Sequence, residues 1–176
     1  MIVTEALKNF RNACLVVAII GGGGCASQDS VPVAPLSNRD YILGIYLPGK
    51  QWLPTANQAG EAKAALLAYL ASDALPADGS QGSFAVAHRS IVASRIDGYS
   101  LQYFGGHYRW TDGHAVPDPL GEEDILINGL CKIPAMGGAD VSKQLIQASD
   151  GGACFFHALY SPARKTILQF SVNGEA

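Results

Sequence analysis

The stretch CFFHALYSPARKTILQFSV, residues 154–172, decides the fold class of this chain. In its first half, apolar side chains recur at every second position: Cys154, Phe156, Ala158 and Tyr160. In its second half, the same spacing is kept by Leu168, Phe170 and Val172. Because successive side chains of a β-strand point to opposite faces, a period of two predicts strands at 154–160 and 166–172. The residues between them, which include a proline, predict a turn.

Further strand segments precede this hairpin. They are rich in β-branched and aromatic residues and lie at 41–47, 84–95, 99–104, 107–110 and 124–131. Turn-forming dipeptides separate the later ones: Asp97-Gly98, Gly105-Gly106, Asp112-Gly113 and Asp150-Gly151. Short connections of this kind join antiparallel neighbours, so we expect an antiparallel sheet.

One segment, 57–72, has the pattern of a helix. Thr55 followed by Gln58 predicts a capping box at its N-terminus. Apolar residues at spacings of three and four form one stripe: Ala59, Ala62, Leu66, Tyr69 and Leu70. Pro76 predicts its end, because a proline disfavours helix at the preceding residue. A helix with a single apolar stripe must pack on another element, which here is the sheet.

These elements predict an α+β fold with one main N-terminal helix packed on a curved antiparallel sheet of five to six strands. The nearest familiar shapes, by analogy alone, are the cystatin-like and nuclear-transport-factor-like (NTF2-like) folds. No internal repeat and no second linker divides the chain after residue 40. We therefore expect a single domain at 40–176.

The N-terminus has the order of segments found in a bacterial export signal. Lys8 and Arg11 are followed by the apolar run 13–20 and then by four glycines that lead into Cys25. An eight-residue apolar run rises only about 12 Å as a helix. This is short of the roughly 30 Å hydrocarbon core, so a stable membrane span is not expected.

The residues Gly23, Gly24 and Cys25 resemble the lipobox of bacterial lipoproteins. The resemblance implies that 1–24 is a signal peptide, that cleavage occurs before Cys25, and that the Cys25 thiol carries diacylglycerol. An ordinary secretory signal and an uncleaved N-terminal anchor are the alternatives.

The residue after the cysteine bears on localisation. Ala26 stands there rather than Asp, which by the sorting rule of the lipoprotein family implies the outer membrane, with the domain facing the periplasm. The following polar, proline-containing residues, 25–39, are expected to be a flexible tether between the lipid and the domain.

Composition and charge exclude one class of partner. The chain has 176 residues, of which 15% are charged, and its formal net charge is −3. Removal of 1–24 would make the mature chain slightly more acidic, because two basic residues and one acidic residue are lost. Without a basic excess, binding to a nucleic acid is not expected.

Cys131 and Cys154 are the two cysteines outside the N-terminal segment. Cys131 closes one predicted strand and Cys154 opens another, as expected if the two strands are antiparallel neighbours. An exported domain folds in an oxidising compartment, so we predict a disulfide between them. Metal ligation, for which a Cys-x-x-Cys pair is missing, and a nucleophilic cysteine are the alternatives.

No residue is identified as catalytic, and no metal or other cofactor is predicted. His107 and His114 lie near several acids in the sequence, but neither a zinc-ligand spacing nor a Gly-x-Ser-x-Gly elbow is present. The histidines are interpreted as residues of a polar loop. The enzymatic alternative is a small periplasmic hydrolase or metal-dependent enzyme that uses His107 and His114.

One group of rings is a candidate binding patch, which could stack on sugars or anchor a protein. Its residues are Tyr103, Phe104, His107, Tyr108 and Trp110. The competing interpretation is that these rings form the core face of the sheet.

The C-terminal half resembles small uncharacterised bacterial envelope lipoproteins that share a DGGxCFF hairpin, here 150–156, and a terminal NGxA, here 173–176. The similarity extends over residues 99–176 and implies structural roles for its motifs but no activity. Together with the N-terminus, it leads us to expect an exported lipoprotein with a non-catalytic binding domain. Such a domain would be an inhibitor or immunity-type module, or an accessory subunit of an envelope complex, with the membrane and an envelope protein as partners.

Overall fold

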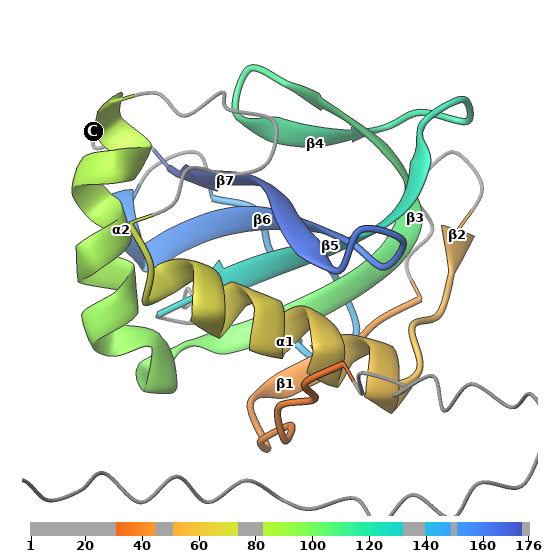
Figure 1. Cartoon of the computed structure of the whole chain (residues 1–176), viewed down its shortest axis with the longest axis horizontal. Helices are drawn as coiled ribbons and strands as arrows, with labels where there is room; N and C mark the ends of the chain where they lie inside the picture. The colour runs from red at the N-terminus through yellow and green to blue at the C-terminus, as the bar shows by residue number, and fades with distance from the viewer. Residues whose placement is uncertain (1–30, 45–50, 74–82, 132–139, 149–150, 174–176) are drawn as a thin grey trace, which may run out of the picture. The chain divides into compact units, whose positions relative to one another are not determined.

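The computed structural model describes residues 31–44, 51–73, 83–131, 140–148 and 151–173, with backbone only at 83–87 (Figure 1). The described chain is an α+β unit with a mixed sheet and two α-helices, which confirms the predicted class. The predicted signal peptide 1–24 and Cys25 lie outside the described residues. No helix in the described part is both long and apolar enough to cross a membrane.

The sheet has the strand order β1-β3-β5-β6-β7, and β2 and β4 also pair with β3. Its strands are β1 Asp40–Ile42, β2 Gln51–Trp52, β3 Ser100–Thr111, β4 His114–Pro117, β5 Glu122–Leu130, β6 Phe155–Ser161 and β7 Thr166–Val172. β1 runs parallel to β3, whereas every other pair is antiparallel. The expectation of a purely antiparallel sheet was therefore wrong in this one pairing.

The β6–β7 hairpin and β5 confirm the strands predicted at 154–160, 166–172 and 124–131. The predicted turn at Asp112-Gly113 is also confirmed. Both residues have positive φ, 50° at Asp112 and 81° at Gly113, and they join β3 to β4 with Thr111 opposite His114. Positive φ at both central residues is the geometry of the tight turns that match strand twist.

The predicted strand at 84–95 is wrong, because these residues form helix α2, Ser83–Arg95. Val92 is fully buried, and Ile96, four residues later, packs on the same core. A spacing of four is helical, and it outweighs the local β-propensity of the segment. The expectation of a single main helix is therefore also wrong, because the described chain has two α-helices.

Gly105-Gly106 is not a turn, because β3 runs through both glycines. Gly105 is opposite Trp52 of β2, and a Cβ at Gly105 would collide with the indole and with the Trp52 carbonyl. Glycine in a strand can mark a close approach as well as a break. Asp97-Gly98 likewise lies not in a hairpin but at the end of the 3₁₀-helix η1, Ile96–Gly98.

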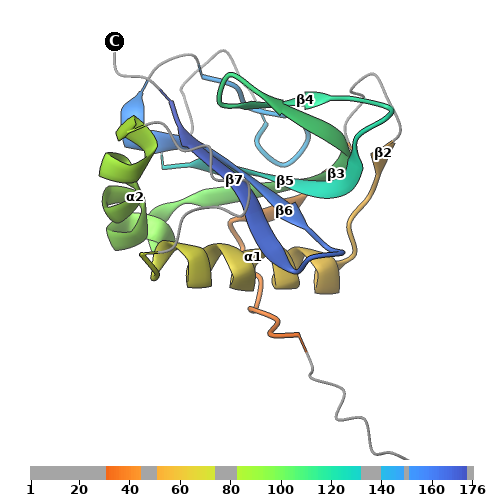
Figure 2. The same cartoon turned by 45° about the horizontal axis from the view of Figure 1, so that its top comes forward.

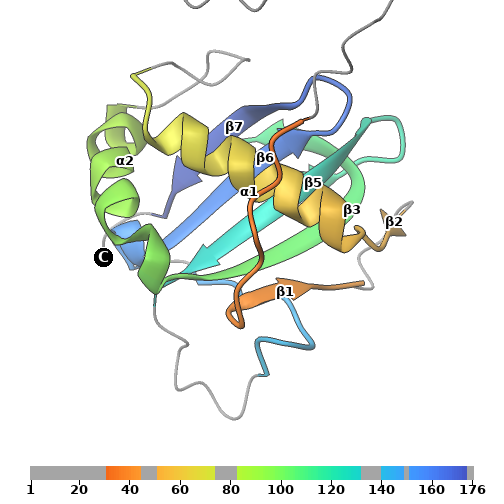
Figure 3. The same ribbon diagram turned by 60° about the horizontal axis from the view of Figure 1, so that its bottom comes forward.

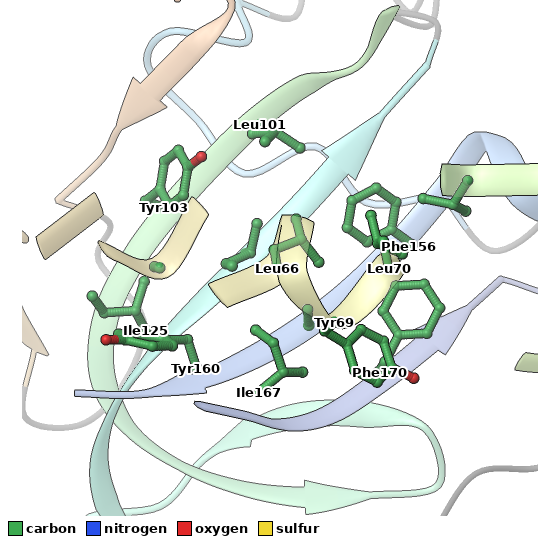
Figure 4. Close-up of a cluster of buried hydrophobic side chains, with 14 of the residues drawn as sticks. Leu66, Tyr69, Leu70, Leu101, Tyr103, Ile125, Phe156, Tyr160, Ile167 and Phe170 are labelled. Atoms are coloured by element: carbon green, nitrogen blue, oxygen red, sulfur yellow. The ribbon is translucent and has the colours of Figure 1, made fainter. Parts of the chain in front are cut away.

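Helix α1, Ala56–Leu70, lies diagonally across one face of the sheet (Figure 3). The predicted capping box is confirmed: the Gln58 N–H donates to Thr55 Oγ1 at 3.2 Å, and the Thr55 N–H donates to Gln58 Oε1 at 2.9 Å. The predicted stripe is buried against the sheet, where Leu66 packs among rings and aliphatic side chains of the strands (Figure 4). The Tyr69 and Phe170 rings are 5.4 Å apart.

The opposite face of the sheet is covered by β4 and by residues 140–148 (Figure 2). A second cluster is buried there: Leu43, Phe104, Tyr108, Leu126, Leu159 and Leu168. Two buried amides hold the irregular segment in place. Gln102 donates to the carbonyls of Val141 at 2.7 Å and Gln144 at 2.8 Å, and Asn128 donates to that of Ile146 at 2.9 Å.

The predicted disulfide between Cys131 and Cys154 is present, with the Cα atoms 4.7 Å apart. The Cys131 N–H also donates to the Cys154 carbonyl at 2.8 Å. The bond thus joins the end of β5 to the start of β6, as expected for antiparallel neighbours. In the chain-entropy model, a loop of this size contributes about 3 kcal/mol.

The chain before β1 crosses α1 (Figure 3). The Ala34 N–H donates to the Gly60 carbonyl at 3.0 Å, and Lys63 Nζ contacts the Pro35 carbonyl at 3.0 Å and Asp40 Oδ2 at 2.9 Å. Burial acts to raise the pKa of Asp40, but hydrogen bonds from Lys63 and Ser37 outweigh it and hold the pKa below its usual value. The described end of the predicted tether therefore lies against the helix.

Candidate binding pocket

A pocket of about 460 Å³ lies where β2 and the start of α1 meet β3, β5 and the β6–β7 turn. Its volume is within the roughly 300–1,000 Å³ range of small-molecule sites. The described residues that line it are Gln51, Trp52, Gln58, His107, Glu123, Pro162 and Ala163. They come from five separate segments, so only the folded sheet brings them together.

Trp52 forms the aromatic wall of the pocket. Its pairing with Gly105 places the indole on a strand position without a side chain. The indole Nε1 is buried and has no hydrogen-bond partner in the part of the chain that the structure describes. The missing side chain at Gly105 therefore allows the Trp52 ring to lie directly on β3.

His107 is oriented by its backbone surroundings. Its Nδ1 is 2.8 Å from the Gly121 carbonyl oxygen. Because a carbonyl only accepts, Nδ1 carries the proton and Nε2 of the neutral ring presents a lone pair. Nε2 is 3.6 Å from Glu123 Oε1, since His107 and Glu123 are directly opposite each other on β3 and β5.

The loop before β5 fixes the Gly121 carbonyl. The Asp118 N–H donates to the His107 carbonyl, and the Gly121 N–H donates to the Asp118 carbonyl, both at 2.9 Å. A Cβ at Gly121 would collide with the backbone of Tyr108, so a glycine is needed for this approach. The imidazole is thus held in one orientation without any acidic partner on Nδ1.

Among the described residues of the pocket, Glu123 supplies the formal charge. Its side chain is 72% exposed, whereas that of His107 is 16% exposed. Its neighbour Glu122 points to the other face of the strand and is bound by Arg164, with Nη2 3.0 Å from Oε1. The two adjacent glutamates therefore have different environments.

The predicted binding patch is not one surface. Tyr103 is buried on the α1 side, where its hydroxyl donates to Asp40 Oδ1 at 3.0 Å, and burial raises its pKa. Phe104 and Tyr108 are buried on the opposite face, and Trp110 packs beside them half-buried. Only His107 of the five predicted residues lines the pocket. The alternation of side chains along β3 divides the patch.

The structure separates His107 from His114. His114 lies on β4, where its ring is 5.8 Å from the ring of His157, and it is not among the described residues of the pocket. Burial, together with nearby His114, lowers the pKa of His157 to about 4. Across the described residues, no group of three potential metal ligands is formed.

Sequence reasoning missed Trp52 and Glu123 as pocket residues. The signal that could have identified Trp52 was the glycine pair within a strand, which marks the close approach of another side chain.

Comparison with known proteins adds no relative: no family model, curated protein or solved structure matches the chain.

Proposed function

We propose that the protein is an exported, lipid-anchored lipoprotein whose domain is a non-catalytic binding module, with its ligand site at the Trp52–His107–Glu123 pocket. The observation that carries this proposal is the pocket itself. It combines an aromatic wall, an oriented imidazole and an exposed carboxylate on rigid strands. Pockets with a few convergent polar groups are the usual sites of ligand binding.

Two exposed leucines support a protein as the partner. Leu53 follows the pocket residue Trp52 and is 62% exposed, and Leu120 precedes Gly121 and is 95% exposed. Apolar side chains beside a polar pocket are typical of surfaces that bind proteins. An inhibitor or immunity-type module, or an accessory subunit of an envelope complex, would use its surface in this way.

The envelope location is supported by the Cys131–Cys154 disulfide, since such bonds persist in oxidising compartments.

The lipidation proposal itself rests on the sequence around Cys25. Metabolic labelling with a palmitate analogue tests it in a bacterial host. We expect the wild-type chain and a Cys14→Ala control to be labelled and Cys25→Ala to be unlabelled. Equal labelling of the Cys25→Ala variant, or an unlabelled wild-type chain, would contradict the proposal.

Site-specific photo-crosslinking in the same host tests partner binding. We expect a crosslinker at Leu120 to give a discrete adduct with an envelope protein. A crosslinker at Lys143, which is exposed on the 140–148 segment, serves as the control and should give none. Absence of an adduct at Leu120, or the same adduct at both positions, would contradict a partner site that includes this leucine.

The enzymatic alternative retains one supporting observation, the His107–Glu123 pair inside a pocket. Neither a hydroxyl, a thiol nor an amine nucleophile is found among the described lining residues. A hydrolase would therefore use His107 as a general base on water. It predicts hydrolysis of chromogenic esters that is abolished by His107→Gln, whereas a binding module predicts no difference between this variant and the wild type.

A further inference from the structure

We infer that the pocket binds a cationic nitrogen group, an ammonium or a guanidinium, between Glu123 and Trp52. This inference rests on the proposed binding function, because it names the chemistry of the ligand at the same pocket.

The first argument is the pairing of two acceptors. The Nδ1–H of His107 donates to the Gly121 carbonyl, so when the ring is neutral its Nε2 presents a lone pair 3.6 Å from Glu123 Oε1. Two acceptors at this distance favour a ligand that donates to both of them. An ammonium or a guanidinium has several N–H groups and can donate to both.

The second argument is charge. Two described arginines near the pocket are already engaged: Arg164 binds Glu122 at 3.0 Å, and Arg109 Nε is 3.5 Å from Asp118 Oδ2. Within the described residues, Glu123 forms no ion pair with a lysine or an arginine, and its contact with His107 leaves the carboxylate charge uncompensated when that ring is neutral. The described lining of the pocket therefore presents a negative charge, which attracts a cation and repels an anion.

The third argument is the aromatic lining of the pocket. An indole face attracts a cation through its quadrupole, more strongly than the other aromatic side chains do. Trp52 lines the same pocket as Glu123, with Gln51 among the remaining polar groups. A metal ion fits less well, because the described residues bring together no third ligand beside His107 and Glu123.

Calorimetric titration of the purified full-length chain with three matched five-carbon probes tests the inference. The probes are cadaverine, a dication; 1,5-pentanediol, its neutral counterpart; and glutarate, a dianion. We expect cadaverine to bind and the diol to bind at least about tenfold more weakly, and we expect no heat from glutarate. Binding of the diol or glutarate as tightly as cadaverine would overturn the cationic ligand while leaving a binding pocket. Absence of binding by cadaverine would overturn it as well.

The adjacent glutamates supply a matched pair of variants. Glu123→Gln should weaken cadaverine binding at least about tenfold, which corresponds to about 1.4 kcal/mol. Glu122→Gln should leave it within about twofold of the wild type, because Glu122 faces away from the pocket. Both side chains are more than half exposed, so neither variant is expected to unfold. Equal binding by wild type and Glu123→Gln would contradict the assigned site.

Titration with a lysine-containing peptide distinguishes two sources of the cationic group. The group is either that of a free amine or that of a lysine or arginine on a protein partner. If it comes from a protein, the peptide Leu-Lys-Leu should bind at least about tenfold more tightly than cadaverine, and acetylation of its lysine should abolish binding. If a free amine is the ligand, the peptide should bind no more tightly than cadaverine. Undiminished binding of the acetylated peptide would overturn the cationic chemistry.

The lipidation test is independent of these titrations. A failed palmitate label would overturn the proposed export and leave the pocket chemistry in place.

Discussion

The two faces of the sheet are covered in physically different ways. The α1 face is covered by a regular helix whose apolar stripe packs on alternating strand residues (Figure 4). On the opposite face, the irregular segment 140–148 is held by the amides of Gln102 and Asn128, which are 0% and 1% exposed. A helix satisfies its own backbone groups, whereas an irregular segment needs side chains to do so. Both faces bury apolar side chains, but the covering segment of the second face also depends on hydrogen bonds from buried side chains.

The largest expected effect is on the α1 face. Leu66→Ala should lower the free energy of unfolding by about 4 kcal/mol, because Leu66 is 0% exposed and its truncation leaves a cavity. Urea denaturation of the purified chain measures this, with Leu120→Ala as the control at a leucine that is 95% exposed. The control should stay within about 0.5 kcal/mol of the wild type. A similar loss in both variants would contradict the assigned core.

Removal of the amide on the other face should have a somewhat smaller effect. Gln102→Leu keeps the bulk but leaves the carbonyls of Val141 and Gln144 without their donor, and we expect a loss of about 3 kcal/mol. Hydrogen exchange should quicken at the Ile146 amide, which donates to Gln102 Oε1. Gln144→Leu, an exposed matched control, should change neither quantity. If Gln102→Leu were as stable as the wild type, the segment would not depend on this network.

Acid should weaken the same face through His157. The pKa of this group is about 4 in the folded protein and 6.5 in the unfolded chain, so the unfolded state binds more protons between these values. The stabilisation is complete above pH 6.5 and is lost as the pH falls toward 4. At pH 5 the loss should be about 2 kcal/mol.

Urea denaturation as a function of pH measures this dependence. His157→Gln should flatten the slope between pH 6.5 and 4, because glutamine does not titrate. An unchanged slope in His157→Gln would show that another group causes the acid sensitivity.

The smallest effect is expected at the start of α1, where the helix supplies its own cap. Thr55→Ala removes the acceptor for the Gln58 N–H and should cost about 1 kcal/mol. Thermal unfolding checks this against Thr111→Ala, an exposed strand threonine that caps nothing. Equal melting temperatures for the two variants would contradict a contribution from the cap.

Elements of the fold that depend on local sequence patterns could be predicted, whereas those that depend on long-range contacts could not. The hairpin at 154–172, the capping box at Thr55 and the disulfide all arise from patterns within a few residues or from strand ends, and they could be predicted. Helix α2 was missed because Val92 within it and the partly buried Ile96 that follows it are too few to reveal a helical period.

The pocket could be predicted only in part. His107 was identified among the candidates, but its partners come from strands far apart in the chain, and a single residue such as Gly105 decides where Trp52 lies. The parallel pairing of β1 was missed for the same reason, since a three-residue strand carries no signal of its direction. Long-range pairing positions these residues, and local sequence patterns do not record it.

The most direct test of the assigned pocket uses the two tryptophans of the chain, which lie in the pocket and on the opposite face. In a ¹⁵N-labelled sample titrated with cadaverine, each indole N–H gives its own signal. We predict a saturable shift of the Trp52 signal, with the Trp110 signal unmoved and the Trp52 response lost in Glu123→Gln. A shift of Trp110 alone, or a Trp52 response that persists in Glu123→Gln, would contradict the account.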